Sequence, residues 1–233
     1  MAGKTFFQEF QERSKEVSDY FLFVKDLEEE NIQLVVEEDA EKPKIQERYP
    51  QLSNTLKASA YLLLYNLVES SMRNAIEAIF KELESQQVSF DRVRPELKKI
   101  VLQNFKRQNP DKVIAQIRDI SLDIIAVGFD KEELFSGNID GLLIRKVAKS
   151  YGFSSRTDYA QTHDGIDLLR VKTNRNDLAH GVQSFAEVGQ GTTADELIEI
   201  KNKTINYLRQ ILENVETYLV NKEYLDSSGP SQF

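Results

Sequence analysis

Apolar residues recur every three or four positions along most of this chain, which is the spacing of one face of an α-helix. The first segment carries such a stripe at Phe6, Phe10, Val17, Phe21 and Val24. A longer stripe from Leu52 to Glu84 is nearly apolar all round in its middle, which is typical of a central helix. Strand signals are scarce. The pattern predicts an all-α fold, an up-and-down helical bundle with long central helices and additional short helices.

Residues typical of helix starts and helix ends predict several shorter helices in the middle of the chain. A basic helix is expected around Asp91 to Arg107, with Pro95 in its first turn. One or two short helices follow between Asp111 and Ala126. Asn138 or Asp140 then begins a helix that Gly152 ends.

The last third is predicted to hold two further helices with a loop between them. His163–His180 reads as one helix that ends at Gly181, and the residues GVQSFAEVGQGTTADE read as a loop. Thr193 and Glu196 form a T-x-x-E capping box that opens a final long helix to Leu225.

These elements predict three parts of the chain. Residues 1–50 form an N-terminal helix and an acidic linker, residues 51–225 form the helical bundle, and residues 226–233 form a polar, disordered tail.

Composition narrows the class of protein. Of 233 residues, 40% are hydrophobic and 29% charged, which is ordinary for a folded domain. No apolar run approaches the roughly 20 residues that span a bilayer, and the N-terminus lacks the apolar core of a signal peptide. We therefore expect a cytoplasmic protein without a membrane partner.

The chain has no cysteine and only two histidines, His163 and His180, which argues against a metal site within one chain. We expect neither metal nor cofactor. The net charge of −8 argues against general coating of nucleic acid but leaves room for a local phosphate site.

The residues best suited to catalysis or phosphate binding are concentrated in the segment RVKTNRNDLAHG. Arg170, Lys172 and Arg175 fall within six residues of an otherwise acidic chain, and Asn176 and His180 follow. A surface helix end is the alternative interpretation, because the helix dipole favours cations at its C-terminus. The spacing alone does not justify a nuclease.

The surrounding sequence resembles the HEPN superfamily, in particular the larger prokaryotic variants from defence and toxin loci. The resemblance rests on RNDLAH with its glycine stop, on the GVQSF…GQGTT…DEL continuation, on YLLLYNLVESSMRNAIEAIF and on FSGNIDGLLIRKVAKSYGF. It covers about Leu52 to Leu225. The family motif is an arginine, a polar residue that is often asparagine, a short spacer and a histidine, which matches Arg175, Asn176 and His180.

The resemblance implies a metal-independent endoribonuclease that acts as a toxin or anti-phage defence effector. The ribose 2′-hydroxyl would attack the adjacent phosphorus and leave a 2′,3′-cyclic phosphate. His180 would transfer the proton, because an imidazole exchanges protons near neutral pH. Arg175 would hold the phosphate, and Asn176 would orient His180 or a phosphate oxygen.

Helix geometry constrains this site. At about 100° per residue, Asn176 and His180 share one face, whereas Arg175 points about 140° away from His180. Either the reach of arginine and distortion near Gly181 close the gap, or a second chain contributes. The resemblance favours a homodimer with a composite active site, because HEPN ribonucleases usually dimerise with their motifs facing one another. An antitoxin or another regulatory protein would be a further partner.

Supporting residues are also expected. Glu69 and Arg73 stand four positions apart on the most apolar helix, either as a local ion pair or with Glu69 positioning Arg175 or His180. With Arg73, the cations Lys172 and Arg170 are candidates for substrate binding or support of the site.

Two other functions fit the same sequence. One is a non-catalytic HEPN module that binds RNA, nucleotide or a protein partner. The other is a structural helical bundle in which the Arg-x4-His pattern occurs by chance.

Overall fold

The computed structural model describes residues 5–32, 51–107, 124–125, 128–129, 134–135 and 137–227. In these ranges all regular elements are helices, apart from one isolated antiparallel β-bridge between Val93 and Leu225. The predicted all-α fold is therefore confirmed.

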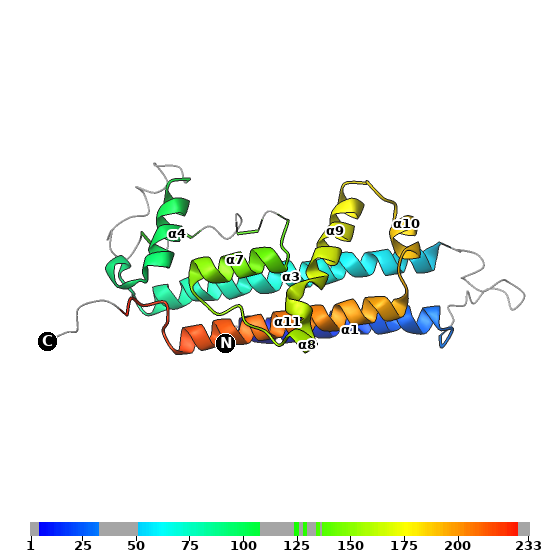
Figure 1. Ribbon diagram of the computed structural model, residues 1–233, viewed down its shortest axis with the longest axis horizontal. Coiled ribbons are helices and arrows are strands. Elements are labelled where there is room, and N and C mark those ends of the chain that lie inside the picture. Colours follow the sequence, from blue (N-terminus) through cyan, green and yellow to red (C-terminus); the bar gives the residue numbers. More distant parts are fainter. Residues whose placement is uncertain are drawn as a thin grey trace, which may run out of the picture. The chain divides into compact units, whose positions relative to one another are not determined.

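The helices are shown in Figure 1. Their bounds are α1 Phe6–Glu28, α3 Leu52–Ser85, η1 Phe90–Arg92, α4 Pro95–Phe105, α7 Gly141–Tyr151, α8 Tyr159–Thr162, η2 His163–Gly165, α9 Asp167–Ala179, α10 Phe185–Gln190 and α11 Ala194–Val220. The chain divides into two compact units, Met1–Glu69 with Asp158–Tyr207, and Ser70–Thr157 with Leu208–Phe233. Two of the boundaries fall within α3 and α11, and the third falls between Thr157 and Asp158, before α8.

In the first unit, α1 runs antiparallel to the start of α3 and to the start of α11 (Figure 1). The Tyr20 hydroxyl of α1 donates to the Leu56 carbonyl of α3 at 2.8 Å. At the other contact, the Lys25 ammonium lies 2.6 Å from the Asp195 carboxylate of α11. The predicted stripe of α1 is largely buried, since Phe10, Val17, Phe21 and Val24 are each at most 5% exposed. Burial of these apolar side chains is what holds the helices together.

In the second unit, the C-terminal end of the described chain is tied to the residues that precede α4. The Arg94 amide donates to the Tyr224 carbonyl at 2.9 Å, and the Asp226 amide donates to the Arg92 carbonyl at 2.8 Å. α4 packs against α7, and Leu97, Val101, Ile144 and Ala148 are fully buried.

Two predicted capping signals are confirmed by their hydrogen bonds. The Asp140 carboxylate accepts from the Leu143 amide at 2.8 Å and begins α7, and Gly152 ends that helix at φ +88°. At the start of α11, the Thr193 amide donates to the Glu196 carboxylate, and the Glu196 amide donates to the Thr193 hydroxyl, both at 3.2 Å. Each contact satisfies a backbone amide that has no partner inside its helix.

The single helix predicted for His163–His180 is wrong in its first turn. His163, Asp164 and Gly165 have φ values of +46°, +51° and +73°, in the left-handed region that cannot continue a right-handed helix. The segment is therefore divided into η2 and α9, with α8 before it, and α9 begins only at Asp167. Gly165 is required at this turn, because a Cβ there would lie 2.8 Å from the Tyr207 ring.

The predicted loop after Gly181 contains the short helix α10. Its capping box is formed by Ser184 and Glu187, whose carboxylate accepts from the Ser184 amide at 2.7 Å. This is the same S/T-x-x-E signature that marks α11. The prediction of an uninterrupted loop is therefore wrong.

The predicted end of the last helix is also corrected. α11 ends at Val220, because the chain turns at Lys222 with φ +53°, and Leu225 lies instead in the bridge to Val93. The basic helix α4 begins at Pro95, the residue predicted for its first turn, after the short η1.

Several predictions lie partly or wholly outside the described residues. They concern the acidic linker within residues 33–50, most of the helix or helices between Asp111 and Ala126, and residues 228–233 of the tail. The division into residues 1–50, 51–225 and 226–233 stays a prediction.

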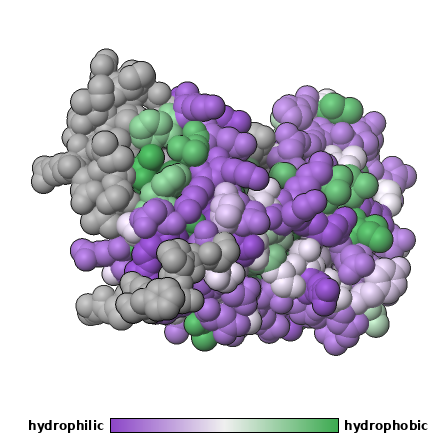
Figure 2. Space-filling view, turned by 60° about the vertical axis from the view of Figure 1, so that its left-hand side comes forward, coloured by the Kyte–Doolittle hydropathy of each residue, from purple (hydrophilic) through white to green (hydrophobic). Residues whose placement is uncertain are grey.

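The face drawn in Figure 2 is mostly hydrophilic, with hydrophobic side chains in separate patches. Scattered exposed apolar side chains are normal for a folded domain. They point to an interface only where several of them align on one face.

Gly189 allows α10 to approach α3 closely. A Cβ at this position would lie 1.9 Å from the Asn54 carbonyl oxygen and 2.4 Å from its carbon, so one of the two backbones would have to move. Gly191, two residues later, has φ −75° and its nearest neighbour would be 3.6 Å away.

We therefore expect Gly189→Ala to lower the free energy of unfolding by about 3 kcal/mol, near the upper end for overpacked sites. Gly191→Ala is the matched control, with an expected change within about 0.5 kcal/mol. Urea denaturation followed by circular dichroism measures both. Equal stability of the two variants would contradict the close approach of α10 to α3.

Candidate active site on helix α9

Helix α9 has a buried side and an exposed side. Leu168, Val171 and Leu178 are buried, and Arg175 lies on the same side of the helix. His180 is exposed at the C-terminal end of α9. Arg175 is half-buried whereas His180 is exposed, and the angular separation of their side chains stays a prediction.

The contacts of Arg175 include one with an aromatic ring and one with its neighbour in the motif. Its Cζ atom lies 4.5 Å from the centroid of the Tyr65 ring on α3, within the range of a cation–π interaction. Its Nη1 atom donates to the Oδ1 of Asn176 at 2.8 Å. The ring fixes one face of the guanidinium, and Asn176 fixes one edge.

Sequence reasoning assigned no role to Tyr65, which lies within the segment YLLLYNLVESSMRNAIEAIF of α3. The available signal was the place of Arg175 among Leu168, Val171 and Leu178. A cation on the buried side of a helix needs a partner on the helix that it faces.

His180 caps the C-terminus of α9. Its amide donates to the Asn176 carbonyl at 2.9 Å. Beyond it, Gly181 has φ +67°, and the Val182 amide donates to the Asp177 carbonyl at 2.8 Å, which is the Schellman arrangement. The glycine turns the chain away and leaves the imidazole at the exposed end of the helix.

Asn176 is linked to both other residues of the motif. Its side-chain oxygen accepts from Arg175, and its backbone carbonyl accepts from the amide of His180. The structure thus assigns its side chain to Arg175. The predicted orientation of His180 or of a phosphate oxygen by Asn176 stays a prediction.

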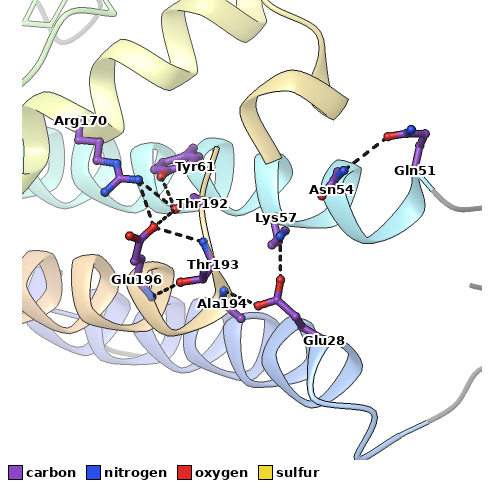
Figure 3. A network of polar contacts seen from close by, with 10 residues as sticks. All are labelled: Glu28, Gln51, Asn54, Lys57, Tyr61, Arg170, Thr192, Thr193, Ala194 and Glu196. Atoms are coloured by element: carbon purple, nitrogen blue, oxygen red, sulfur yellow. Dashed lines mark hydrogen bonds and ion pairs between the residues drawn. The ribbon is translucent and has the colours of Figure 1, made fainter. Parts of the chain in front are cut away.

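Arg170 belongs to a polar network at the start of α11 (Figure 3). Its Nη2 donates to the Thr192 hydroxyl at 3.0 Å and lies 3.6 Å from the Glu196 carboxylate. Thr192 also contacts the Tyr61 hydroxyl of α3, at 3.4 Å. Arg170 therefore connects α9 to the start of α11, while Lys172, one turn before Asn176, is half-buried.

The same end of α11 is held by Glu28 of α1. One carboxylate oxygen accepts from the Ala194 amide at 2.6 Å, and the other lies 2.7 Å from the ammonium of Lys57, a buried residue of α3 (Figure 3). The Glu28 carboxylate thus accepts a hydrogen bond from a backbone amide that has no partner within α11, and it balances the charge of Lys57. The start of α11 is thereby tied to α1 and α3, and through Arg170 to α9.

Glu69 and Arg73 are both half-buried on α3. Glu69 stands four residues after Tyr65, so the two side chains share a face of the helix. This register places Glu69 on the side of α3 that Arg175 contacts. Its role in positioning Arg175, and the role of Arg73, stay predictions.

The described part of the chain contains no cluster of three or more histidine or acidic side chains suited to a metal ion. Among its helices, none combines the length and apolarity needed to cross a membrane.

A helical bundle whose motif helix presents an arginine, an asparagine and a terminal histidine defines the HEPN class of domain, as the sequence suggests. A comparison with protein families confirms the class: the family model described as HEPN_MAE_28990-like HEPN matches residues 3–224. The chain therefore belongs to this HEPN family, and the match includes α1 as well as the later helices. No curated protein and no solved structure matches the chain.

HEPN membership gives a coarse function. The family often includes ribonucleases, and HEPN domains commonly act on RNA and dimerise. A function on RNA or nucleotides is thus indicated at the level of the family.

The network around Glu196 predicts that the stability of the fold depends on pH. The Thr193 amide, followed by the Thr192 hydroxyl, lowers the pKa of Glu196 below its ordinary value of 4.5. A carboxyl group whose pKa is lower in the folded state stabilises the fold above the unfolded-state pKa, and this contribution is lost as the pH falls through the folded-state pKa.

We therefore expect Glu196→Gln to lower the melting temperature at neutral pH, and the difference from wild type to disappear as the pH falls below 4.5. Thermal unfolding followed by circular dichroism at a series of pH values measures this. Glu199→Gln, an exposed residue of the same helix, is the control. A difference that grows on acidification would contradict the network.

Proposed function

We propose that this chain is a metal-independent endoribonuclease of the HEPN class, acting as a toxin or anti-phage defence effector. The observation that carries the proposal is the arrangement of the motif on α9. Arg175 is fixed by Tyr65 and Asn176, and His180 stands exposed at the end of the same helix. A pre-positioned cation and an accessible imidazole are the two groups that cleavage by a 2′-hydroxyl needs.

In the proposed reaction, the ribose 2′-oxygen attacks the adjacent phosphorus and the bond from phosphorus to the 5′-oxygen breaks. His180 takes the proton of the 2′-hydroxyl and delivers it to the departing 5′-oxygen. Arg175 stabilises the charge on the phosphorane with donors in the plane of its guanidinium. The products are a 2′,3′-cyclic phosphate and a 5′-hydroxyl.

We further propose that each site takes Arg175 from one copy of the chain and His180 from a second copy. The helix period separates the two side chains by about 140°, so one phosphate is reached more readily when a partner supplies one of them. The homodimer agrees with the common behaviour of HEPN domains. It also brings four basic motif side chains to one region of an acidic protein.

The outer side of α9 fits the contact between copies. Ile166, Leu169, Thr173, Asn176 and His180 fall within a sector of about 80° at 100° per residue. Ile166 is 61% exposed and Leu169 is 54% exposed. Two apolar side chains aligned with His180 would bring a partner to the end of the helix that the reaction uses.

The proposed reaction leads to a prediction about RNA cleavage. Wild-type protein is expected to cleave RNA in the presence of EDTA and to leave 2′,3′-cyclic phosphate ends. Arg175→Ala and His180→Ala are each expected to lower the rate at least about 100-fold, since each removes a group that acts in the transition state. Gel analysis of labelled RNA and mass spectrometry of the products measure both.

The matched controls are His163→Ala, which removes the other histidine, and Arg92→Ala, which removes an exposed arginine. Both should cleave like wild type. Cleavage that survives both motif substitutions, or that requires a metal, would refute the assignment. Wild-type protein that binds RNA without cutting it would favour the non-catalytic HEPN module instead.

The proposed shared site leads to a prediction about the dimer. Leu169→Arg is expected to yield monomers and to abolish cleavage, because a buried, unpaired charge at the interface is costly. Leu142→Arg on α7 is the matched control, since Leu142 is 55% exposed, and it should remain dimeric and active. Analytical ultracentrifugation and the RNA assay measure the two effects. A fully active Leu169→Arg monomer would contradict the shared site.

A further inference from the structure

We propose that Tyr65 is a positioning residue of this protein, whose buried ring sets the orientation in which Arg175 meets a phosphate group. This role rests on the ribonuclease function proposed above. Nothing in the motif itself specifies it, because Tyr65 lies on α3, far from RNDLAH in sequence.

The ring is a rigid platform. Tyr65 is 1% exposed and lies between Leu64 and Val68, which are at most 1% exposed. In a close-packed interior a large aromatic side chain has few alternative rotamers, so its ring plane is fixed by the surrounding core. The cation above the ring, at 4.5 Å from the centroid, takes its position from that plane.

The contact between the Arg175 guanidinium and the Tyr65 ring leaves Arg175 able to bind a phosphate. The five N–H donors of arginine lie in the plane of the guanidinium, whereas a cation–π contact uses the face of that plane. Tyr65 therefore contacts Arg175 without competing for its donors. A phosphate can be bound at the edge of the guanidinium while the ring stays in place.

Tyr65 and Asn176 both contribute to the orientation of Arg175. The ring sets the tilt of the guanidinium, and the 2.8 Å hydrogen bond from Nη1 to Asn176 sets its rotation within that plane. Arginine has a long side chain with many rotamers, and a catalytic group must be held close to its productive geometry. Together the two contacts select one orientation before substrate arrives.

This account depends on the ring and not on the Tyr65 hydroxyl. Phenylalanine presents the same face to a cation, whereas leucine presents none. Tyr65→Phe should therefore retain the function, and Tyr65→Leu should lose it. Tyr61→Leu is the matched control, because Tyr61 lies one turn earlier on α3 and is also 1% exposed.

The test has two measurements. In a ¹H–¹⁵N NMR spectrum of the arginine side chains, the Nε–Hε signal that disappears in Arg175→Lys belongs to Arg175. The Tyr65 ring current should displace that proton signal in wild type, in Tyr65→Phe and in Tyr61→Leu. In Tyr65→Leu it should return to the position typical of an arginine without an aromatic neighbour. Circular dichroism confirms that each variant is folded.

In the RNA assay, Tyr65→Leu should lower kcat/KM about tenfold, with Tyr65→Phe restoring it. An undisplaced signal in wild type, or Tyr65→Leu cleaving like wild type, overturns the proposal, as does an equal loss in Tyr61→Leu. If wild-type protein cleaves no RNA, the ribonuclease function fails, and the role of Tyr65 at a phosphate group fails with it. The NMR spectra still decide whether the ring holds Arg175.

Discussion

The contact between the Arg175 guanidinium and the Tyr65 ring is the interaction on which the proposed function depends. It keeps a positive charge on the buried side of α9, where a cation without a partner would be costly. Helix periodicity predicts that His180 points about 140° away from Arg175. The proposed dimer, the exposed Ile166 and Leu169, and the division of each site between two copies all follow from this separation.

The rest of the first unit keeps α9 in place for this contact. At its start, three left-handed residues and the close packing of Gly165 against Tyr207 turn the chain into the helix. Near its first turn, Arg170 connects it to Thr192 and Glu196 at the start of α11. Gly181 then ends it beside His180. A short helix with few buried side chains is thus supported at both ends.

Much of the fold could be predicted from the sequence, because the signals involved are local. The apolar stripes predict α1 and α3, and Asp140 and Thr193 mark helix starts through contacts three residues away. The turn at His163 could also have been predicted, because histidine and aspartate are enriched in left-handed backbone and Asp164-Gly165 is a turn dipeptide. α10 could have been predicted, because Ser184 and Glu187 carry the same capping signature as α11.

The candidate site likewise has parts that local sequence predicts and parts that it does not. The motif and the angular separation of Arg175 from His180 follow from sequence and helix period alone. The stack on Tyr65 and the place of Arg170 in a network depend on which segments distant in sequence come together. Those partners are set by the packing of α9 against α3 and α11, and no local pattern contains them.

The shared site is tested most directly by mixed dimers that carry Arg175→Ala in one copy and His180→Ala in the other, isolated through two different affinity tags. Each single variant alone should be inactive. The mixed dimer keeps one complete pair, Arg175 from one copy and His180 from its partner, and should recover about half of the wild-type cleavage rate. A pure mixed dimer as inactive as its parents would contradict the shared site.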